Sequence, residues 1–234
     1  MDRLQPAHTS AAQQTQQYRF QLIVGMVGDP ARGSTGYLGD LGALPAVLED
    51  LNTRGTQPLF VMDPIDGVGA GYNGPYAPQI GGAGAAFMDA WGTPYQYAGT
   101  AQIVSAGSDR QFGTADDLTF PDVPPLTTGN LTITVTGVPN NGGSPCVLGE
   151  DDADVFAAAS AGGVRTEARL AGPIGTGGPF TGAGLHKGLH GIRVTGQADF
   201  AGAVTRDVAE LIGGTTQLRV TLIQPTGATP GCAA

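Results

Sequence analysis

The chain contains few charged residues, and very few of them are lysine. Only 13% of its 234 residues are charged, and a single lysine, Lys187, accompanies ten arginines against 20 acidic residues, for a formal net charge of −9. An acidic chain with no basic cluster repels phosphate backbones, which argues against nucleic-acid binding. Low charge combined with 39 glycines and 17 prolines indicates a loop-rich, β-heavy exported protein rather than a helical cytosolic one.

Long apolar runs are also missing. No stretch of about 18 apolar residues is present to span a membrane, and the first residues lack the apolar core of a signal peptide. Since an exported protein would carry such a signal, we expect the sequence to be a trimmed piece of a longer protein, with Met1 as an added start. Hydrophobic residues still make up 41% of the chain, which is enough for a packed core.

There are only two cysteines, Cys146 and Cys232. In a glycine-rich, lysine-poor chain they predict one disulfide bond formed in an oxidising compartment. It would close a loop of about 86 residues and contribute roughly 4–5 kcal/mol in the chain-entropy model. Two buried free thiols are the alternative, which the position of Cys232 near the chain end disfavours.

Histidine is equally scarce, with His8, His186 and His190 only. A spacing of four residues suits two metal ligands on a helix, but Gly188 and Gly191 argue against a helix there. On one strand, residues four apart lie about 13 Å from each other, too far for one metal ion. We therefore interpret His186 and His190 as turn and strand residues.

No catalytic motif accompanies these few histidines. The sequence contains neither a Gly-x-Ser-x-Gly elbow nor a phosphate-binding loop, so we predict that the protein is not an enzyme; a secreted hydrolase with an unrecognised site is the least favoured alternative. The acidic run at residues 150–154 is interpreted as a solvated loop or a helix start. A second cation site or a general acid pair are its alternatives.

Apolar spacing predicts the secondary structure of the first half. Residues 8–27 read as a helix, residues 43–53 as a second, shorter helix, and two short strands follow at 95–98 and 102–105. An acidic turn occupies residues 107–118. The proline-rich segment 120–125 is expected to be an extended linker, because consecutive prolines cannot lie in a central strand.

The second half reads as β-structure. Strict alternation of apolar and polar side chains marks a strand at 131–136, and further strands are predicted near 164–170, 189–197, 204–211 and 216–223. Gly213-Gly214 is interpreted as a hairpin turn between the last two. This spacing predicts a small antiparallel sandwich. Two domains are therefore expected, at residues 1–122 and 126–234.

Three carboxylates bracket the acidic turn. Asp109, Asp116 and Asp117 flank a loop that contains Gly107 and Gly113. Calcium takes six to eight oxygen ligands from carboxylates and backbone carbonyls, and glycines let the backbone bend so that carbonyls point inward. The spacing is not that of an EF-hand. The alternative to a calcium site is a solvated acidic turn.

Four segments in this order resemble a known family. They are G-Y-L-G-D-L-G-A-L-P at 36–45, G-P-Y at 74–76, D-A-W-G-T-P-Y-Q-Y at 89–97, and S-A-G-S-D through G-T-A-D-D at 105–117. Together they resemble the major pseudopilin of type II secretion and related type IV pilin-like proteins. Those proteins carry a G-P-Y element, a D-x-W-G-x-P-Y-x-Y element and a calcium loop in the same order.

The resemblance implies a fold and a metal site. It implies an α+β fold, with a pilin-like N-terminal helix packed on a small antiparallel sheet and followed by an all-β sandwich domain. It also implies that loop 105–118 binds Ca²⁺ through the side chains of the three aspartates and through carbonyls near two further residues, the full set being Asp109, Asp116, Asp117, Ala106 and Phe112. Arg110 departs from the small residue usual at its position.

The implied function is structural. The chain would be a calcium-stabilised subunit of an extracytoplasmic pilus or pseudopilus, located in the periplasm or at the cell surface. Its partners would be other copies or homologous subunits, and the inner membrane through an apolar N-terminal helix that this sequence lacks. An exported calcium-dependent adhesin or carbohydrate-binding module is the alternative.

The second half resembles a different module. G-L-H-G-I-R-V-T-G at 188–196 is similar to the G-x-H-x-I-x-V strand of transthyretin-like or carboxypeptidase-regulatory-like sandwiches, although the order His190-Gly191-Ile192 makes the match approximate. Such a module implies a structural or adhesive role. Its few aromatic residues, Phe156, Phe180 and Phe200, weaken the adhesin alternative, since sugar-binding surfaces use clustered aromatics.

Overall fold

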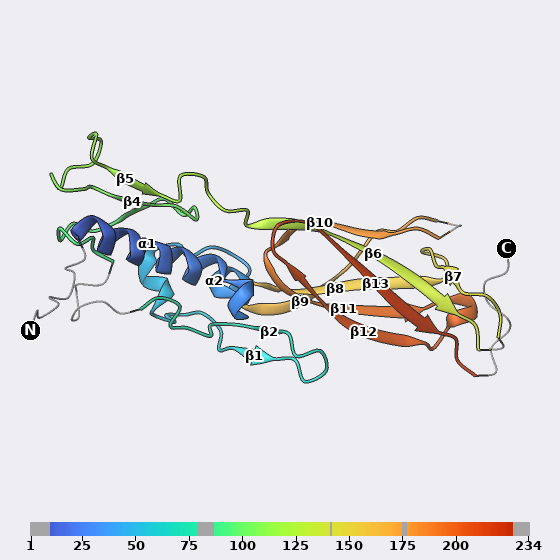
Figure 1. The fold of residues 1–234 in the computed structure, drawn as a ribbon. Coiled ribbons are helices and arrows are strands. Elements are labelled where there is room, and N and C mark those ends of the chain that lie inside the picture. Colours follow the sequence, from blue (N-terminus) through green and yellow to red (C-terminus); the bar gives the residue numbers. More distant parts are fainter. Residues whose placement is uncertain (1–9, 79–86, 141, 175–176, 227–234) are drawn as a thin grey trace, which may run out of the picture.

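The structure is a computed structural model that describes residues 10–78, 87–140, 142–174 and 177–226. Its ribbon is elongated (Figure 1), with the longest helix and several small strands at one end and two larger sheets at the other. Each end has its own hydrophobic core cluster.

The expected α+β class is wrong, because the fold is mainly β. Strands account for 39% of the structure and helical residues for 16%, and the described residues contain two α-helices. The physical reason is local. The described residues of the glycine- and proline-rich segment, 55–78 and 87–94, form loops and very short strands, while the second half forms long strands.

Helix α1 (Ala11–Val27) begins at a capping box. The Gln13 backbone N–H donates to Ser10 Oγ at 3.3 Å, and the Ser10 backbone N–H donates to Gln13 Oε1 at 3.0 Å. This pairing satisfies two N–H groups that a helix start leaves without partners. Tyr18, Leu22 and Met26 lie on the buried face, as their helical spacing predicts.

The helix predicted at residues 43–53 is wrong. Helix α2 spans Gly36–Leu41, and residues 43–53 contain only a short 3₁₀ turn, Leu48–Leu51. Gly42 ends α2 with φ of 80°, a left-handed conformation that favours glycine. A side chain there would also collide with the Ser160 carbonyl oxygen, only 2.1 Å from its Cβ.

Small strands surround α1 and α2. β1 (Val61–Met62) pairs antiparallel with β2 (Gly69–Ala70), and a second antiparallel sheet runs in the order β3 (Gln96–Tyr97), β4 (Ile103–Ser105) and β5 (Leu118–Phe120). α1 lies against β4 and β5. The buried side chains of this end gather around α1, α2 and β4.

The larger end is a sandwich of two four-stranded sheets. One contains β6 (Thr128–Val138) between β10 (Phe180–His186) and β13 (Gly214–Ile223), with β7 (Cys146–Val147) also on β6. The other has the order β12 (Val204–Leu211), β11 (Gly188–Gly196), β8 (Ala153–Ala161) and β9 (Val164–Arg169). A 3₁₀ turn, Ala198–Phe200, precedes β12.

The predicted hairpin at Gly213-Gly214 is wrong. β12 and β13 belong to different sheets, so these glycines carry the chain across the sandwich. β13 then pairs parallel with β6, and the sandwich is not purely antiparallel. The strands at 204–211 and 216–223 were predicted, but the sequence of a strand contains no information on which neighbour it takes.

Polar contacts join the two ends. Ser160 Oγ on β8 donates to the Asp40 carbonyl oxygen at 2.7 Å, and the Gly163 N–H donates to the Leu41 carbonyl oxygen at 3.0 Å. Arg165 on β9 forms ion pairs with Asp63, at 3.2 Å, and with Asp66 in the β1–β2 hairpin. Hydrogen bonds and ion pairs therefore connect the two ends of the molecule that contain the two core clusters.

Candidate functional site

The acidic loop between β4 and β5 is tied at its start to the tryptophan element. Asp89 is 5% exposed, and its Oδ1 accepts from the Thr93 N–H at 2.8 Å and the Trp91 N–H at 3.1 Å. Its Oδ2 accepts from Ser105 Oγ at 2.6 Å, and that hydroxyl accepts from the Gly107 N–H at 3.2 Å. Asp89 therefore holds both the turn at Trp91 and the first residues of the loop.

Asp116 braces the interior of the loop. Its Oδ1 accepts from Thr114 Oγ1 at 2.7 Å, and its Oδ2 accepts from Ser108 Oγ at 2.9 Å and from the Asp109 N–H at 3.0 Å. These donors, with Thr114 first, hold the pKa of Asp116 well below its usual range, because they stabilise the charged form. Asp116 is therefore ionised and already occupied by protein donors.

Asp117 is the aspartate with an unused oxygen. Its Oδ2 accepts from the Gly113 N–H at 2.7 Å, whereas its Oδ1 is buried and has no hydrogen-bond partner among the described residues. Asp109 lies on the exposed side of the loop, where its Oδ1 accepts from the Gln111 N–H at 2.8 Å. A buried carboxylate oxygen without a partner is costly, so it suits a cation.

The two residues expected to supply carbonyl ligands lie in different settings. Ala106 is fully buried beside Ser105, while the Phe112 side chain is 40% exposed at the loop tip. Backbone turns bend the intervening chain: the Arg110 N–H donates to the Gly107 carbonyl oxygen at 3.4 Å, and the Asp117 N–H donates to the Thr114 carbonyl oxygen at 3.5 Å.

The arrangement of the three aspartates decides how calcium could fit the loop. Within the described ranges, no group of three or more His, Cys, Asp and Glu side chains lies together in a way that could hold a metal ion. The three aspartates thus share one loop without converging as a set. The orphaned Oδ1 of Asp117 fits a cation whose other ligands are backbone oxygens and water, with Asp116 as the brace of the loop rather than its ligand.

Arg19 ties the far end of the loop to α1. Its Nη1 donates to the Leu118 carbonyl oxygen, directly after Asp117, and its guanidinium lies 5.6 Å from the centre of the Phe120 ring. Burial lowers the pKa of Arg19. Sequence reasoning missed this residue; the available signal was an arginine beside Tyr18 on the apolar face of a predicted helix.

The other two motifs are also linked to each other. Tyr76 of the G-P-Y element donates its hydroxyl proton to Asp40 Oδ2 at 2.9 Å, and Thr35 Oγ1 donates to Asp40 Oδ1 at 2.5 Å. Burial raises the pKa of Asp40, although both donors oppose the shift. The Tyr76 ring also packs edge-on against Tyr37 and Tyr72, with ring centres 5.5 and 5.3 Å away.

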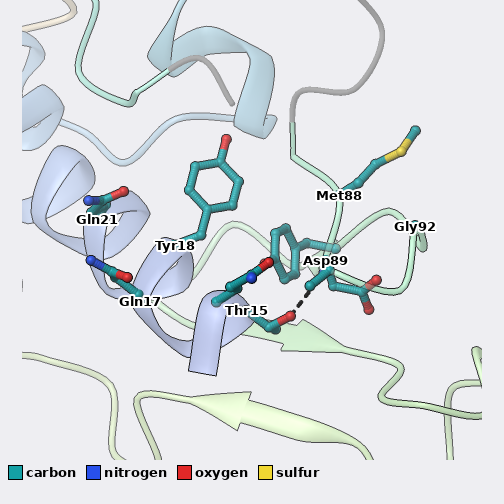
Figure 2. Close-up of a pocket in the computed structure, with 10 residues that line it drawn as sticks. Thr15, Gln17, Tyr18, Gln21, Met88, Asp89 and Gly92 are labelled. Carbon is teal, nitrogen blue, oxygen red and sulfur yellow. Dashed lines mark hydrogen bonds between the residues drawn. The ribbon is translucent and has the colours of Figure 1, made fainter. Parts of the chain in front are cut away.

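A pocket of about 540 Å³ lies between α1 and the tryptophan element. Figure 2 shows Gln17, Tyr18 and Gln21 entering it from the helix, opposite Met88 and Asp89. The Ala90 N–H donates to Thr15 Oγ1 at 2.9 Å across its floor. The Asp89 carboxylate in its lining already accepts hydrogen bonds from three donors.

The acidic run at 150–154 is held by ion pairs. Arg169 Nε lies 2.6 Å from Asp154 Oδ1, and its Nη2 lies 3.9 Å from Glu150 Oε2. Glu150 Oε1 also accepts from the Gly172 N–H at 2.6 Å. These carboxylates thus join β8 to β9 and the segment after it. The run forms a turn at 150–152 and then enters β8, so it does not start a helix.

The predicted disulfide stays a prediction, because Cys232 lies outside the described residues. Cys146 opens β7 and packs against the sandwich core.

The aromatic residues of the second half are not arranged as a binding platform. Phe180 and Phe200 are core residues with 0% and 1% exposure. The guanidinium of Arg193 lies 4.0 Å from the centre of the Phe156 ring. Stacking of a sugar on Phe156 would have to displace that arginine.

Comparison with known proteins identifies no family for this chain: no protein-family model matches it, and no curated protein matches it.

Proposed function

We propose that this protein is a structural subunit of an extracytoplasmic pilus or pseudopilus, stabilised by calcium in the loop at 105–118. The observation that carries the proposal is the pairing of the four motifs. Asp40 of the first bonds to Tyr76 of the second, and Asp89 of the third bonds to Ser105 of the fourth. Segments that resemble one family in sequence thus also depend on each other in space.

The position of α1 supports an assembly role. Its first turns expose a polar face, while its last two turns are nearly enclosed by the core cluster around α1, α2 and β4. α1 lies roughly parallel to the long axis of the molecule, and its first turn lies at the end remote from the sandwich (Figure 1). A neighbouring subunit could pack on this free face without disturbing the core. No helix in the described part of the chain is long and apolar enough to cross a membrane.

The loop gives calcium a defined mechanical role. It is pinned at Ser105 by Asp89 and at Leu118 by Arg19 of α1. A cation on the unused Oδ1 of Asp117 would neutralise buried charge between these anchors, and it would hold β4, β5 and α1 as one unit. The sandwich would then lie on the surface of the filament, since it extends from the opposite end of the molecule (Figure 1).

The metal is tested by thermal unfolding in EDTA and then with added Ca²⁺ or Mg²⁺. We expect Ca²⁺, but not Mg²⁺, to raise the Tm of the parent chain, because a flexible site with carbonyl ligands favours the larger ion. Asp117→Asn should abolish this increase. Asp116→Asn is the matched control: it should lower the Tm in EDTA, through its hydrogen bonds, and retain a calcium-dependent increase.

A parent chain with equal Tm values under all three conditions and no metal by elemental analysis would contradict the calcium proposal. Assembly is tested separately, with an antibody against the purified chain applied to source cells. We expect the antigen in filaments sheared from the surface or in membrane-attached multimers that form crosslinked ladders. An antigen found only as a free monomer would overturn the filament proposal.

A further inference from the structure

Two histidines lie side by side where β10 passes into β11. His186 is the last residue of β10, and His190 is the third residue of β11. Their ring centres are 4.9 Å apart. The expectation that they are too distant for one metal ion assumed a single strand; here the chain turns at Lys187 and Gly188, where φ is 134°, and crosses from one sheet to the other.

Hydrogen bonds fix which nitrogen of each ring is free. His190 Nε2 lies 2.8 Å from the His186 carbonyl oxygen, and His186 Nδ1 lies 3.0 Å from the Lys187 carbonyl oxygen. A carbonyl oxygen only accepts, so these two nitrogens carry the protons. The remaining nitrogens, His186 Nε2 and His190 Nδ1, are unprotonated and each carries a lone pair. Both are buried, and neither has a hydrogen-bond partner among the residues described.

This is the arrangement in which histidine binds metal. A metal-ligating histidine usually donates its second ring N–H to a carbonyl or carboxylate, which fixes the tautomer and the ring orientation. Both rings do so here. His190 is 0% exposed, so its unpartnered nitrogen is shielded from bulk water.

We propose that His186 Nε2 and His190 Nδ1 bind a divalent transition-metal ion of the zinc class. With metal–nitrogen bonds of about 2.0–2.1 Å, and about 1.1 Å from each nitrogen to its ring centre, the ion lies about 3.2 Å from both centres. With both nitrogens directed at the ion, ring centres 4.9 Å apart correspond to an angle of about 100° at the metal, near the tetrahedral value that zinc prefers.

The site lies at the junction of the two cores. A pocket of about 550 Å³ is lined by His186, by Ser160 and Thr128 of the sandwich, and by Leu38 of α2, so an ion can approach the pair from the His186 side. The next residue of the turn, Gly188, touches Gly39 of α2 so closely that a Cβ on it would lie 2.8 Å from the Gly39 Cα. An ion bound here would stiffen this contact.

The ligand set also sets the expected affinity. Since the described residues place no third His, Cys, Asp or Glu with this pair, water completes the coordination. Two protein ligands bind less tightly than the four of a closed structural site, so we expect micromolar rather than nanomolar binding. The site depends neither on the acidic loop nor on the filament proposal.

The test is calorimetric titration of the full chain with Zn²⁺. We expect one site in the parent and at least tenfold weaker binding in His186→Gln. His8→Gln, which changes the third histidine of the sequence, is the matched control and should bind as the parent does. Asp117→Asn should also bind normally, which separates this site from the acidic loop.

A second measurement covers the case in which His186→Gln does not fold. In nitrogen-15 spectra of the parent chain, Zn²⁺ should shift His186 Nε2 and His190 Nδ1 and leave the His8 ring nitrogens in place. Absence of Zn²⁺ binding to the parent, equal binding by a folded His186→Gln, or a shift confined to His8 would each overturn the proposal.

Discussion

Removal of the Asp89 carboxylate should loosen both the tryptophan element and the acidic loop. The carboxylate accepts hydrogen bonds from Trp91, Thr93 and Ser105 at 3.1, 2.8 and 2.6 Å. A hydrogen bond to a charged group contributes about 1.5–3 kcal/mol, and a buried donor left without a partner costs about 1–3 kcal/mol. Trp91 and Thr93 are half-buried and can regain water, whereas Ser105 is fully buried.

We therefore expect Asp89→Ala to lower the free energy of unfolding by about 3–4 kcal/mol. Ser105→Ala should cost about 2 kcal/mol, since it leaves Asp89 Oδ2 and the Gly107 N–H without a partner. The double variant should cost about 1–2 kcal/mol less than the sum of the two, because both single changes remove the same hydrogen bond.

The assay is urea unfolding followed by fluorescence of Trp91, the only tryptophan in the chain, which lies within the element under test. Asp122→Ala is the control, because this exposed carboxylate should change the free energy of unfolding by less than about 0.5 kcal/mol. Single effects that add to within about 0.3–0.5 kcal/mol would refute the claim that Asp89 and Ser105 act as one unit.

Two further predictions concern the sandwich. Gly191→Val should release the β1–β2 hairpin, because a Cβ at Gly191 would lie 2.1 Å from Asp66 Oδ2 and displace its ion pair with Arg165; limited proteolysis should then cut within residues 59–70, and an unchanged digestion pattern would contradict this. The free energy of unfolding should also decrease as the pH is lowered, because burial lowers the pKa of His190 from 6.5 to about 4. The unfolded chain binds this proton first as the pH falls below about 6.5, so up to about 3 kcal/mol of stability is lost by about pH 4. His190→Gln should flatten this part of the pH profile, and an equally steep profile would contradict the assignment.

Secondary structure could be predicted from the sequence where it depends on neighbouring residues. The helix predicted at 8–27 from apolar spacing forms over Ala11–Val27, and the strand predicted at 131–136 from alternation forms within Thr128–Val138. The helix predicted at 43–53 did not form, because apolar spacing there competed with Gly42 and with the Asp50 carboxylate. That carboxylate accepts from the Ala46 and Val47 N–H groups, at 3.0 and 3.2 Å, and leaves room only for a short turn.

The residues of the acidic loop could be predicted from the sequence, but their geometry could not. The sequence showed that Asp109, Asp116 and Asp117 share one glycine-containing loop. It could not show that Asp116 is occupied by three donors while an oxygen of Asp117 has none, because hydrogen-bond partners depend on how the loop closes. The contribution of Arg19 was hidden for a similar reason, since its partner Leu118 is 99 residues away.

The sequence by itself thus determined that the chain is acidic and that its two halves carry apolar patterns of different period. These are properties of neighbouring residues, which side-chain size, charge and backbone preference decide directly. Only the tertiary structure decided that β13 lies parallel to β6, that Asp89 meets Ser105, and that the rings of His186 and His190 face one another across a turn. Each of these depends on which distant segments pack together, and many pairings bury similar apolar area, so the outcome is fixed by the packing of the whole chain.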